Sequence, residues 1–280
     1  MFLLPAVLPA AVSPKATDLG VEILGLPLTN SVVTTWIIGL LIILGVRLAV
    51  GTPKLVPGKG QSVVEGLAVG LRDTLEPIVG KRMIGKTFPI LCGFFVFILL
   101  MNWSGLLPGV GTLKFAQAAA PGDGHAATWI DLIRPANSDL NTTLALSVLS
   151  FGFWTYFVLR YAGIKVLAHD LFGNKADKRE IGLVMWLLLS FIFLAVGGIE
   201  VVSILFRLIS LSFRLYGNVF GGENLIHALG GIAPVVIPAV AAMLEVLVGL
   251  IQAFVFTLLS AVYIGLICNH EGGHEDEHAH

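Results

Sequence analysis

The chain has 280 residues, of which 56% are hydrophobic and only 12% are charged. Soluble proteins carry about twice this share of charge, and disordered chains are far more polar, so neither class is a first interpretation. The net charge of −1 offers no basic face for nucleic acid, and the composition indicates a membrane protein.

The first 28 residues are expected to form an N-terminal segment outside the membrane-embedded part. Residues 1–12 are apolar, but Pro5 and Pro9 interrupt them and no basic residue precedes them. A cleaved signal peptide and a strap at the membrane surface both remain open for this segment. We expect a single membrane-embedded domain to follow at 29–268.

Six long stretches lack any acidic or basic residue other than histidine. A hydrocarbon core about 30 Å thick is crossed by about 20 apolar helical residues, and the alternating pattern of membrane β-strands is absent. We therefore predict an all-α polytopic membrane protein with five to six hydrophobic helical segments. The stretches are 23–46, 87–113, 140–159, 181–199, 224–244 and 246–269.

The segment 61–80 has a different pattern. Its apolar residues recur at helical spacing with charged residues between them. This pattern predicts an amphipathic helix on the membrane surface, although a short helix packed against the protein itself explains it equally well. The apolar set is Val63, Val64, Leu67, Leu71, Leu75 and Ile78.

Lysine and arginine residues are unevenly distributed among the loops. They are frequent at 47–86 and again at 160–179, whereas the loop 111–138 holds only Lys114 and Arg134. By the positive-inside rule, the two basic loops and the amphipathic helix are cytoplasmic, and the N-terminal segment is external.

Three charged residues lie within apolar sequence in the second half of the chain. Glu200, Arg207 and Arg214 are spaced seven apart, so they fall on one helical face, which Asn218 continues. Charges inside a membrane are costly and usually face a cavity, a bundle interior or a partner. Snorkelling to the interface explains Arg207 equally well, whereas Arg214 indicates function.

Further polar residues fall on two helical faces. About 13 Å beyond Arg214, on the opposite face of its helix, Glu223 is followed one turn later by His227. Two polar faces indicate a wet path between two helices. The face on the last helix consists of Glu245, Gly249, Gln252 and Tyr263.

The last residues, 269–280, are rich in histidine and acidic residues. We expect a flexible cytoplasmic tail here, with a metal site as the alternative.

Five motifs occur in order along the chain. The most specific are SLSFRLYGNVFGGE at 210–223 and QAFVF at 252–256, followed by Tyr263. The others lie at 89–102, 105–109 and 139–146. Together, over about residues 29–265, they resemble subunit a of rotary F-type ATP synthases.

The resemblance implies a stator that passes ions, most simply protons, across the membrane beside a turning ring of c subunits. Arg214 matches the essential arginine of the family, which holds a c-subunit carboxylate ionised and separates two half-channels. The implied fold has five spans and a surface helix, with the ion-path helices at 181–268 ending in a tilted hairpin against the c ring. Gly217, Gly221 and Gly222 would then form a groove for that ring, with packing inside the chain as the alternative.

The resemblance also assigns positions along the ion path. Glu223 and Glu245 would line the external half-channel, and Gln252 would lie near Arg214. We place Glu200, about 21 Å before Arg214 along the helix, in the internal half-channel. A structural pairing of Glu200 or Glu223 with a neighbouring subunit is the alternative.

Partners and location follow from the same resemblance. It implies a multi-pass protein of the bacterial inner membrane within an ATP synthase complex, in contact with the c ring, the b subunits of the peripheral stalk and lipid. Its N-terminus would be external and its C-terminus cytoplasmic. The sequence has no phosphate-binding loop, so we expect no nucleotide binding, no cofactor or metal, and no catalysis by this chain alone.

The sequence departs from the family pattern in three respects. Glu occupies both 223 and 245, where the family often pairs one Glu with one His, and a histidine stands at His227 instead. The proline often found before the arginine is absent. The stretch 181–199 is more apolar than expected, which leaves open whether it is a separate span. A secondary transporter whose arginine binds an anionic substrate is the alternative function, although its repeated halves are not seen.

Overall fold

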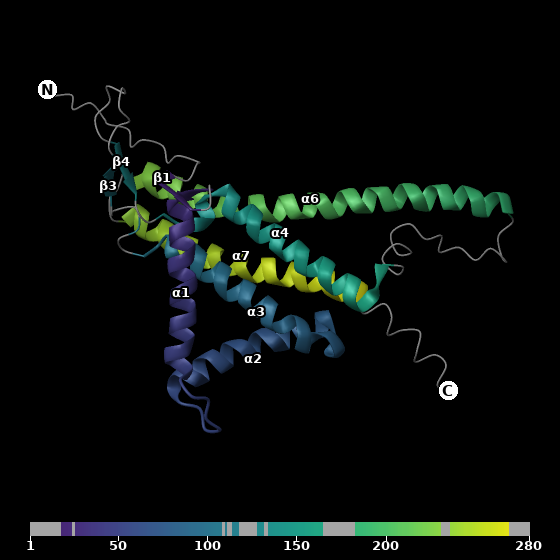
Figure 1. The fold of residues 1–280 in the computed structure, drawn as a ribbon, viewed down its shortest axis with the longest axis horizontal. Helices are drawn as coiled ribbons and strands as arrows, with labels where there is room; N and C mark the ends of the chain where they lie inside the picture. The colour runs from purple at the N-terminus through teal and green to yellow at the C-terminus, as the bar shows by residue number, and fades with distance from the viewer. Residues whose placement is uncertain are drawn as a thin grey trace. The chain divides into compact units, whose positions relative to one another are not determined.

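The computed structural model describes residues 18–23, 26–107, 110, 114–117, 128–131, 134–164, 183–230 and 236–268. Within these ranges the protein is overwhelmingly helical (Figure 1). The α-helices are α1 (Asn30–Val50), α2 (Lys59–Val79), α3 (Lys81–Ser104), α4 (Leu140–Phe157), α6 (Leu183–Gly230) and α7 (Val236–Cys268). The amphipathic helix expected at 61–80 is therefore confirmed as α2, and its last turn meets α3 almost directly.

Five of the described helices are long and apolar enough to cross a membrane. The polytopic all-α prediction is confirmed, with five spans rather than six. The stretch 181–199 is no separate span, because α6 runs without a break from Leu183 to Gly230. The stretch 224–244 contains the end of α6 and the start of α7. The spans are Asn30–Val50, Lys81–Ser104, Leu140–Tyr161, Leu188–Ile226 and Pro238–Leu266.

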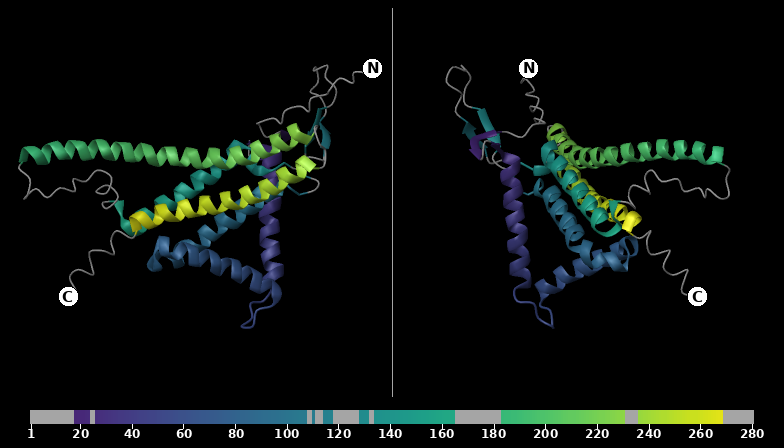
Figure 2. Two further views of the ribbon diagram at one scale, coloured as in Figure 1. Left: turned by 180° about the vertical axis from the view of Figure 1, so that it is seen from behind. Right: turned by 45° about the vertical axis from the view of Figure 1, so that its right-hand side comes forward.

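Two small antiparallel hairpins accompany the helices, and the hydrophobic pattern gave no sign of them. Strands β1 (Asp18–Ile23) and β2 (Leu26–Thr29) pair just before α1, and β3 (Lys114–Gln117) pairs with β4 (Thr128–Asp131). Both hairpins lie beside the N-terminal end of α1 (Figures 1 and 2).

The chain divides into two compact units. The first is Met1–Glu65, Gly93–Thr143 and Phe213–Val255, and the second is Gly66–Cys92, Leu144–Ser212 and Phe256–His280. In the first unit, Ile38 of α1, Met101 of α3 and Ala136 form a buried cluster. Ala136 belongs to the 3₁₀ turn η1 (Ala136–Ser138), which therefore anchors the segment before α4 to the first and third helices.

The second unit buries one face of α2. Leu75 and Val79 are fully buried, and α2 ends at Gly80, whose φ of 89° places it in the left-handed region that glycine tolerates best. Because Gly80 also accepts hydrogen bonds from the amides of Met83 and Ile84, α3 begins at once. In the same unit a Cβ atom at Gly265 would collide with the carbonyl oxygen of Ile78, so glycine lets α7 approach α2 closely.

Large apolar side chains remain exposed along the spans. On α1, Leu40, Ile43 and Leu48 are more than half exposed, and much of α6 is similar. Such surfaces are not stable in water but suit lipid or a membrane-embedded partner. Burial therefore supports the membrane assignment that the composition indicated.

Candidate ion path

Arg214 lies on an outward face of α6 in the first unit. Its side chain is exposed, whereas Leu211, Leu215 and Val219 turn the other face of the same helix inward. Among the residues that the structure describes, Arg214 has no hydrogen bond or ion pair. A guanidinium stays charged even when desolvated, so within a membrane it needs either water or a counter-charge from beyond the described residues.

Two of the three predicted groove glycines share that outward face. Gly217 and Gly221 are exposed, and a Cβ atom at either would meet no other atom within 4 Å. Gly222 lies differently: a Cβ there would stand 3.0 Å from Cδ and from Oε1 of Glu245. Gly222 therefore lets α6 approach the carboxyl group on α7.

The carboxyl groups of Glu223 and Glu245 thus come to one place in the first unit. Glu223 directly follows the glycine that contacts Glu245, and its Oε2 accepts a hydrogen bond of 3.5 Å from Nη2 of Arg134. Arg134 is only 5% exposed. This arrangement pairs Glu223 with a buried cation, next to the glycine that faces Glu245.

A short polar network adjoins these carboxyl groups. Asn137 of η1 donates from Nδ2 to Oδ1 of Asn102 on α3 (2.8 Å), and Nδ2 of Asn102 donates to the carbonyl oxygen of Gly249 (3.1 Å). Both asparagines are buried. Gly249 lies on the polar face of α7 between Glu245 and Gln252, so the network reaches that face one turn beyond the carboxyl group.

Two buried polar atoms in this region have no partner among the described residues, namely Oδ1 of Asn137 and Nε2 of Gln252. Buried polar groups of this kind are normally satisfied by protein or by ordered water. Both atoms lie in the first unit, as Glu245 does, and a hydrated path between helices would satisfy them.

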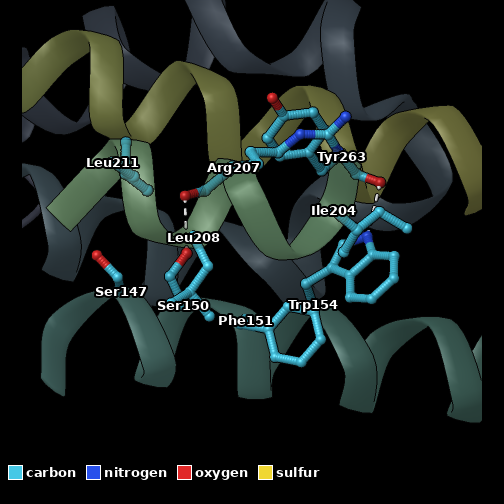
Figure 3. A pocket seen from close by; sticks show the side chains of 10 residues that line it. Ser147, Ser150, Phe151, Trp154, Ile204, Arg207, Leu208, Leu211 and Tyr263 are labelled. Atoms are coloured by element: carbon cyan, nitrogen blue, oxygen red, sulfur yellow. Dashed lines mark hydrogen bonds between the residues drawn. The ribbon is translucent and has the colours of Figure 1, made fainter. Parts of the chain in front are cut away.

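A pocket lies within the second unit (Figure 3). Its volume is about 40 Å³, enough for about two or three water molecules. The guanidinium carbon of Arg207 stands 3.6 Å from the centroid of the Tyr263 ring. Trp154 donates to the carbonyl oxygen of Tyr263, and the hydroxyls of Ser150 and Ser260 are 2.9 Å apart. Arg207 is therefore half-buried in a cation–π contact, which simple snorkelling to water does not describe.

The remaining predicted residues are placed as follows. Asn218 is half-buried in the first unit, and Glu200 is exposed in the second without a described partner. His227 belongs to α6, but its side chain lies outside the described residues, as does the tail at 269–280. In the part of the chain that is described, no group of three His, Cys, Asp or Glu residues could hold a metal ion.

Comparison with known proteins decides the family. A family model described as ATP synthase A chain matches residues 32–265. The chain belongs to this family. ATP synthase subunit a of Moorella thermoacetica is 30% identical over 240 residues, which cover 85% of this chain and 90% of the relative. That of Geotalea daltonii is 30% identical over 236 residues (84% and 86%), and ATP synthase subunit a 2 of a Bradyrhizobium species is 29% identical over 254 residues (90% and 95%).

Membership of the ATP synthase A chain family confirms the resemblance seen in the motifs. The chain is a multi-pass membrane subunit of an ATP synthase complex, and the transporter alternative finds no support.

Sequence reasoning missed three residues of this ATP synthase A chain that the structure brings to the carboxyl groups. Arg134 appeared only as a sparse charge of an external loop, Asn102 only as the last residue of the motif at 89–102, and Asn137 not at all. Their signal was weak: a lone arginine before Pro135, an asparagine within the uncharged stretch 87–113 and another just before the stretch 140–159. Their roles become visible only when η1 and the end of α3 are seen against α6 and α7.

Proposed function

We propose that this chain is the ion-conducting stator of its ATP synthase, passing protons through two half-channels to carboxyl groups on a neighbouring c ring. The observation that carries the proposal is Arg214, exposed beside Gly217 and Gly221 on a smooth face of α6. A membrane charge without a described partner, next to a surface that another helix can approach closely, fits a moving carboxylate on a separate subunit.

Arg214 would act electrostatically. An uncompensated charge in a membrane costs from a few to more than ten kcal/mol, so the passing carboxylate is held ionised while it lies opposite the guanidinium. The same positive charge repels protons and separates the two half-channels. Arginine suits this role because it does not lose its proton on burial, as lysine can.

The external half-channel would use the carboxyl groups of Glu223 and Glu245. The network of Asn102 and Asn137 supports this assignment, because it reaches the polar face of α7 at Gly249, between Glu245 and Gln252, with buried polar atoms available to water. Arg134 would hold Glu223 in place. The pair of glutamates here replaces the Glu and His pair expected from the family pattern.

The internal half-channel would begin at Glu200. The pocket beside Arg207 and Tyr263 lies in the same unit and has room for water. The N-terminus would be external and the C-terminus cytoplasmic, in the bacterial inner membrane, with b subunits of a peripheral stalk as further partners. Catalysis would take place in other subunits.

The first test is purification of the tagged chain in mild detergent, followed by mass spectrometry of the proteins that accompany it. We expect a small two-helix c subunit, b subunits and the nucleotide-binding subunits. A lone chain or homodimer that moves a solute in liposomes would contradict the proposal and recast Arg214 as a substrate-binding charge.

A further inference from the structure

In the second unit, two cationic side chains lie near one aromatic ring, where the start of α3 comes close to the end of α4. Nζ of Lys86 stands 4.1 Å from the centroid of the Tyr161 ring, and the guanidinium carbon of Arg160 stands 5.9 Å from the same centroid. Tyr161 is half-buried and stacks on Phe157, with ring centroids 6.1 Å apart. The ring therefore holds two positive charges near each other. This feature takes no part in the proposed ion path.

These charges have no negative counterpart in the part of the protein that is described. Lys86 and Arg160 are exposed and form no ion pair with any described residue, and α3 adds the exposed Lys81 and Arg82 in its first turn. Of the described carboxylates in the same unit, Glu76 is already paired with Arg72, and the exposed Asp73 and Glu200 form no ion pair with the cluster. Like charges repel one another unless an anion joins them, so the cluster favours a negatively charged ligand.

The cluster sits where two spans end. The apolar spans are Lys81–Ser104 and Leu140–Tyr161, so the first turns of α3 and the last turn of α4 meet the same membrane interface. At this point α4 passes into the π-helical turn η2 (Val158–Ala162), which Gly163 closes with a φ of 82° and a hydrogen bond to the carbonyl oxygen of Val158. Such turns are frequent at functional sites, and tyrosine is enriched at membrane interfaces.

We propose that Lys86, Arg160 and Tyr161 bind the phosphate of an anionic phospholipid. A phosphodiester carries one negative charge and several acceptor oxygens, which suit an ammonium group and a planar guanidinium together. The Tyr161 ring keeps Lys86 near Arg160 through the cation–π contact. The acyl chains then lie along the exposed apolar side chains of the spans. The net negative charge of the headgroup contributes to binding as well as the phosphate oxygens. Phosphatidylglycerol, which has this net charge, therefore binds more tightly than phosphatidylcholine, which does not.

The test measures lipid binding to the purified ATP synthase complex by native mass spectrometry. The parent complex, a Lys86→Gln/Arg160→Gln variant and a Lys54→Gln/Lys59→Gln variant are titrated with phosphatidylglycerol and with phosphatidylcholine. Lys54 and Lys59 are exposed and lie outside the cluster, so the second variant removes the same charge elsewhere. A further arm adds excess inorganic phosphate to the parent complex.

We expect the Lys86→Gln/Arg160→Gln variant to bind phosphatidylglycerol about 25-fold more weakly, since each cation near a membrane surface contributes about five-fold. The control variant keeps the parental affinity, and inorganic phosphate does not displace the lipid. Unchanged phosphatidylglycerol binding in the double variant, or equal binding of phosphatidylcholine by the parent, would overturn the proposal. Displacement of phosphatidylglycerol by inorganic phosphate would show that the site binds free phosphate rather than a lipid. If the double variant fails to assemble, Arg160→Gln alone should show the five-fold loss.

Discussion

Nη2 of Arg134 lies 3.5 Å from Oε2 of Glu223, so a segment that precedes α4 holds a carboxylate near the end of α6. The two residues are 89 positions apart in the chain. Both side chains are largely withdrawn from solvent, which makes this pair different in kind from the exposed pair of Arg72 and Glu76. Loss of one member of this pair should therefore cost more free energy than loss of Arg72 or Glu76, because exposed ion pairs contribute little.

Arg134→Gln should slow ATP-driven proton pumping by about ten-fold or more. A charge-assisted hydrogen bond contributes about 1.5–3 kcal/mol, and its loss leaves Glu223 free to move away from Glu245. Pumping is measured in inverted membrane vesicles, with assembly checked by co-purification of the complex. Arg72→Gln is the matched control, since its pair has nearly the same length but lies at the surface. Equal pumping by the two variants would contradict a role for Arg134 in holding Glu223.

Glu223→Gln should also slow transport while preserving assembly. The amide has nearly the shape of the carboxyl group but can neither accept nor release the transported proton. In the combined Arg134→Gln/Glu223→Gln variant no charged partner is left unpaired, so its complex should be more stable to heat than that of Arg134→Gln alone. Thermal unfolding of the purified complexes tests this order. Unchanged proton flux of Glu223→Gln over a range of pH would remove this residue from the path.

Asn102→Leu should lower both the stability of the first unit and the rate of proton flux. The substitution leaves the amide group of Asn137 buried without its acceptor, which costs about 1–3 kcal/mol, and removes the hydrogen bond from Asn102 to the carbonyl oxygen of Gly249 on the polar face of α7. Asn141→Leu provides the comparison, because Asn141 is exposed near the start of α4. Proton flux is measured on vesicles, and stability is measured on the purified complex. If Asn102→Leu pumps at the parental rate, the network is not part of the proton route.

Uncharged stretches revealed the spans because the hydrocarbon core imposes a minimum length on apolar helices. They did not reveal the length of α6. Glu200 interrupts the uncharged stretch at 181–199, but a single charge does not break the backbone hydrogen bonds of a helix, and α6 continues to Gly230. The opposite error arose at 224–244, where α6 ends at Gly230 and α7 begins at Val236 within one uncharged stretch. The glycine and proline residues in this part of the sequence were a better signal of a helix boundary than the hydropathy.

The sequence predicted the residues of the candidate site to different extents for a similar reason. Arg214, Gly217 and Gly221 share an exposed face of α6, whereas helical spacing had joined Arg214 with Glu200, Arg207 and Asn218 rather than with the glycines. Contacts between distant segments were not accessible in this way. Asn102 and Gly249 are 147 positions apart, and no period within either helix relates them. The hairpins of β1–β2 and β3–β4 were missed because their strands are short, and β2 lies within the uncharged stretch 23–46 that was assigned to a helix.

Gly217→Leu should impair coupling to the c ring without disturbing this chain. A Cβ atom at Gly217 would meet no side chain or other helix within 4 Å among the described residues, so we expect any penalty to arise from a neighbour that packs on the Arg214 face. Gly45→Leu on α1 is the matched control, since its site is equally open within the chain. We expect Gly217→Leu to lower the amount of c subunit that co-purifies, and Gly45→Leu to leave it unchanged. Parental amounts of c subunit with both variants would place the ring on another face.

Arg214→Ala should abolish ATP-driven proton pumping while leaving the complex assembled. The guanidinium makes no described contact within the chain, so its removal costs this protein little folding free energy. What it removes is the counter-charge that holds the c-subunit carboxylate ionised between the half-channels. Arg214→Lys should retain part of the activity at most, because an ammonium group in a membrane loses its proton more readily than a guanidinium. Pumping, passive proton leak and co-purified c subunit are measured on the same vesicles. Normal pumping by Arg214→Ala, with the complex intact, would refute the assignment of this arginine.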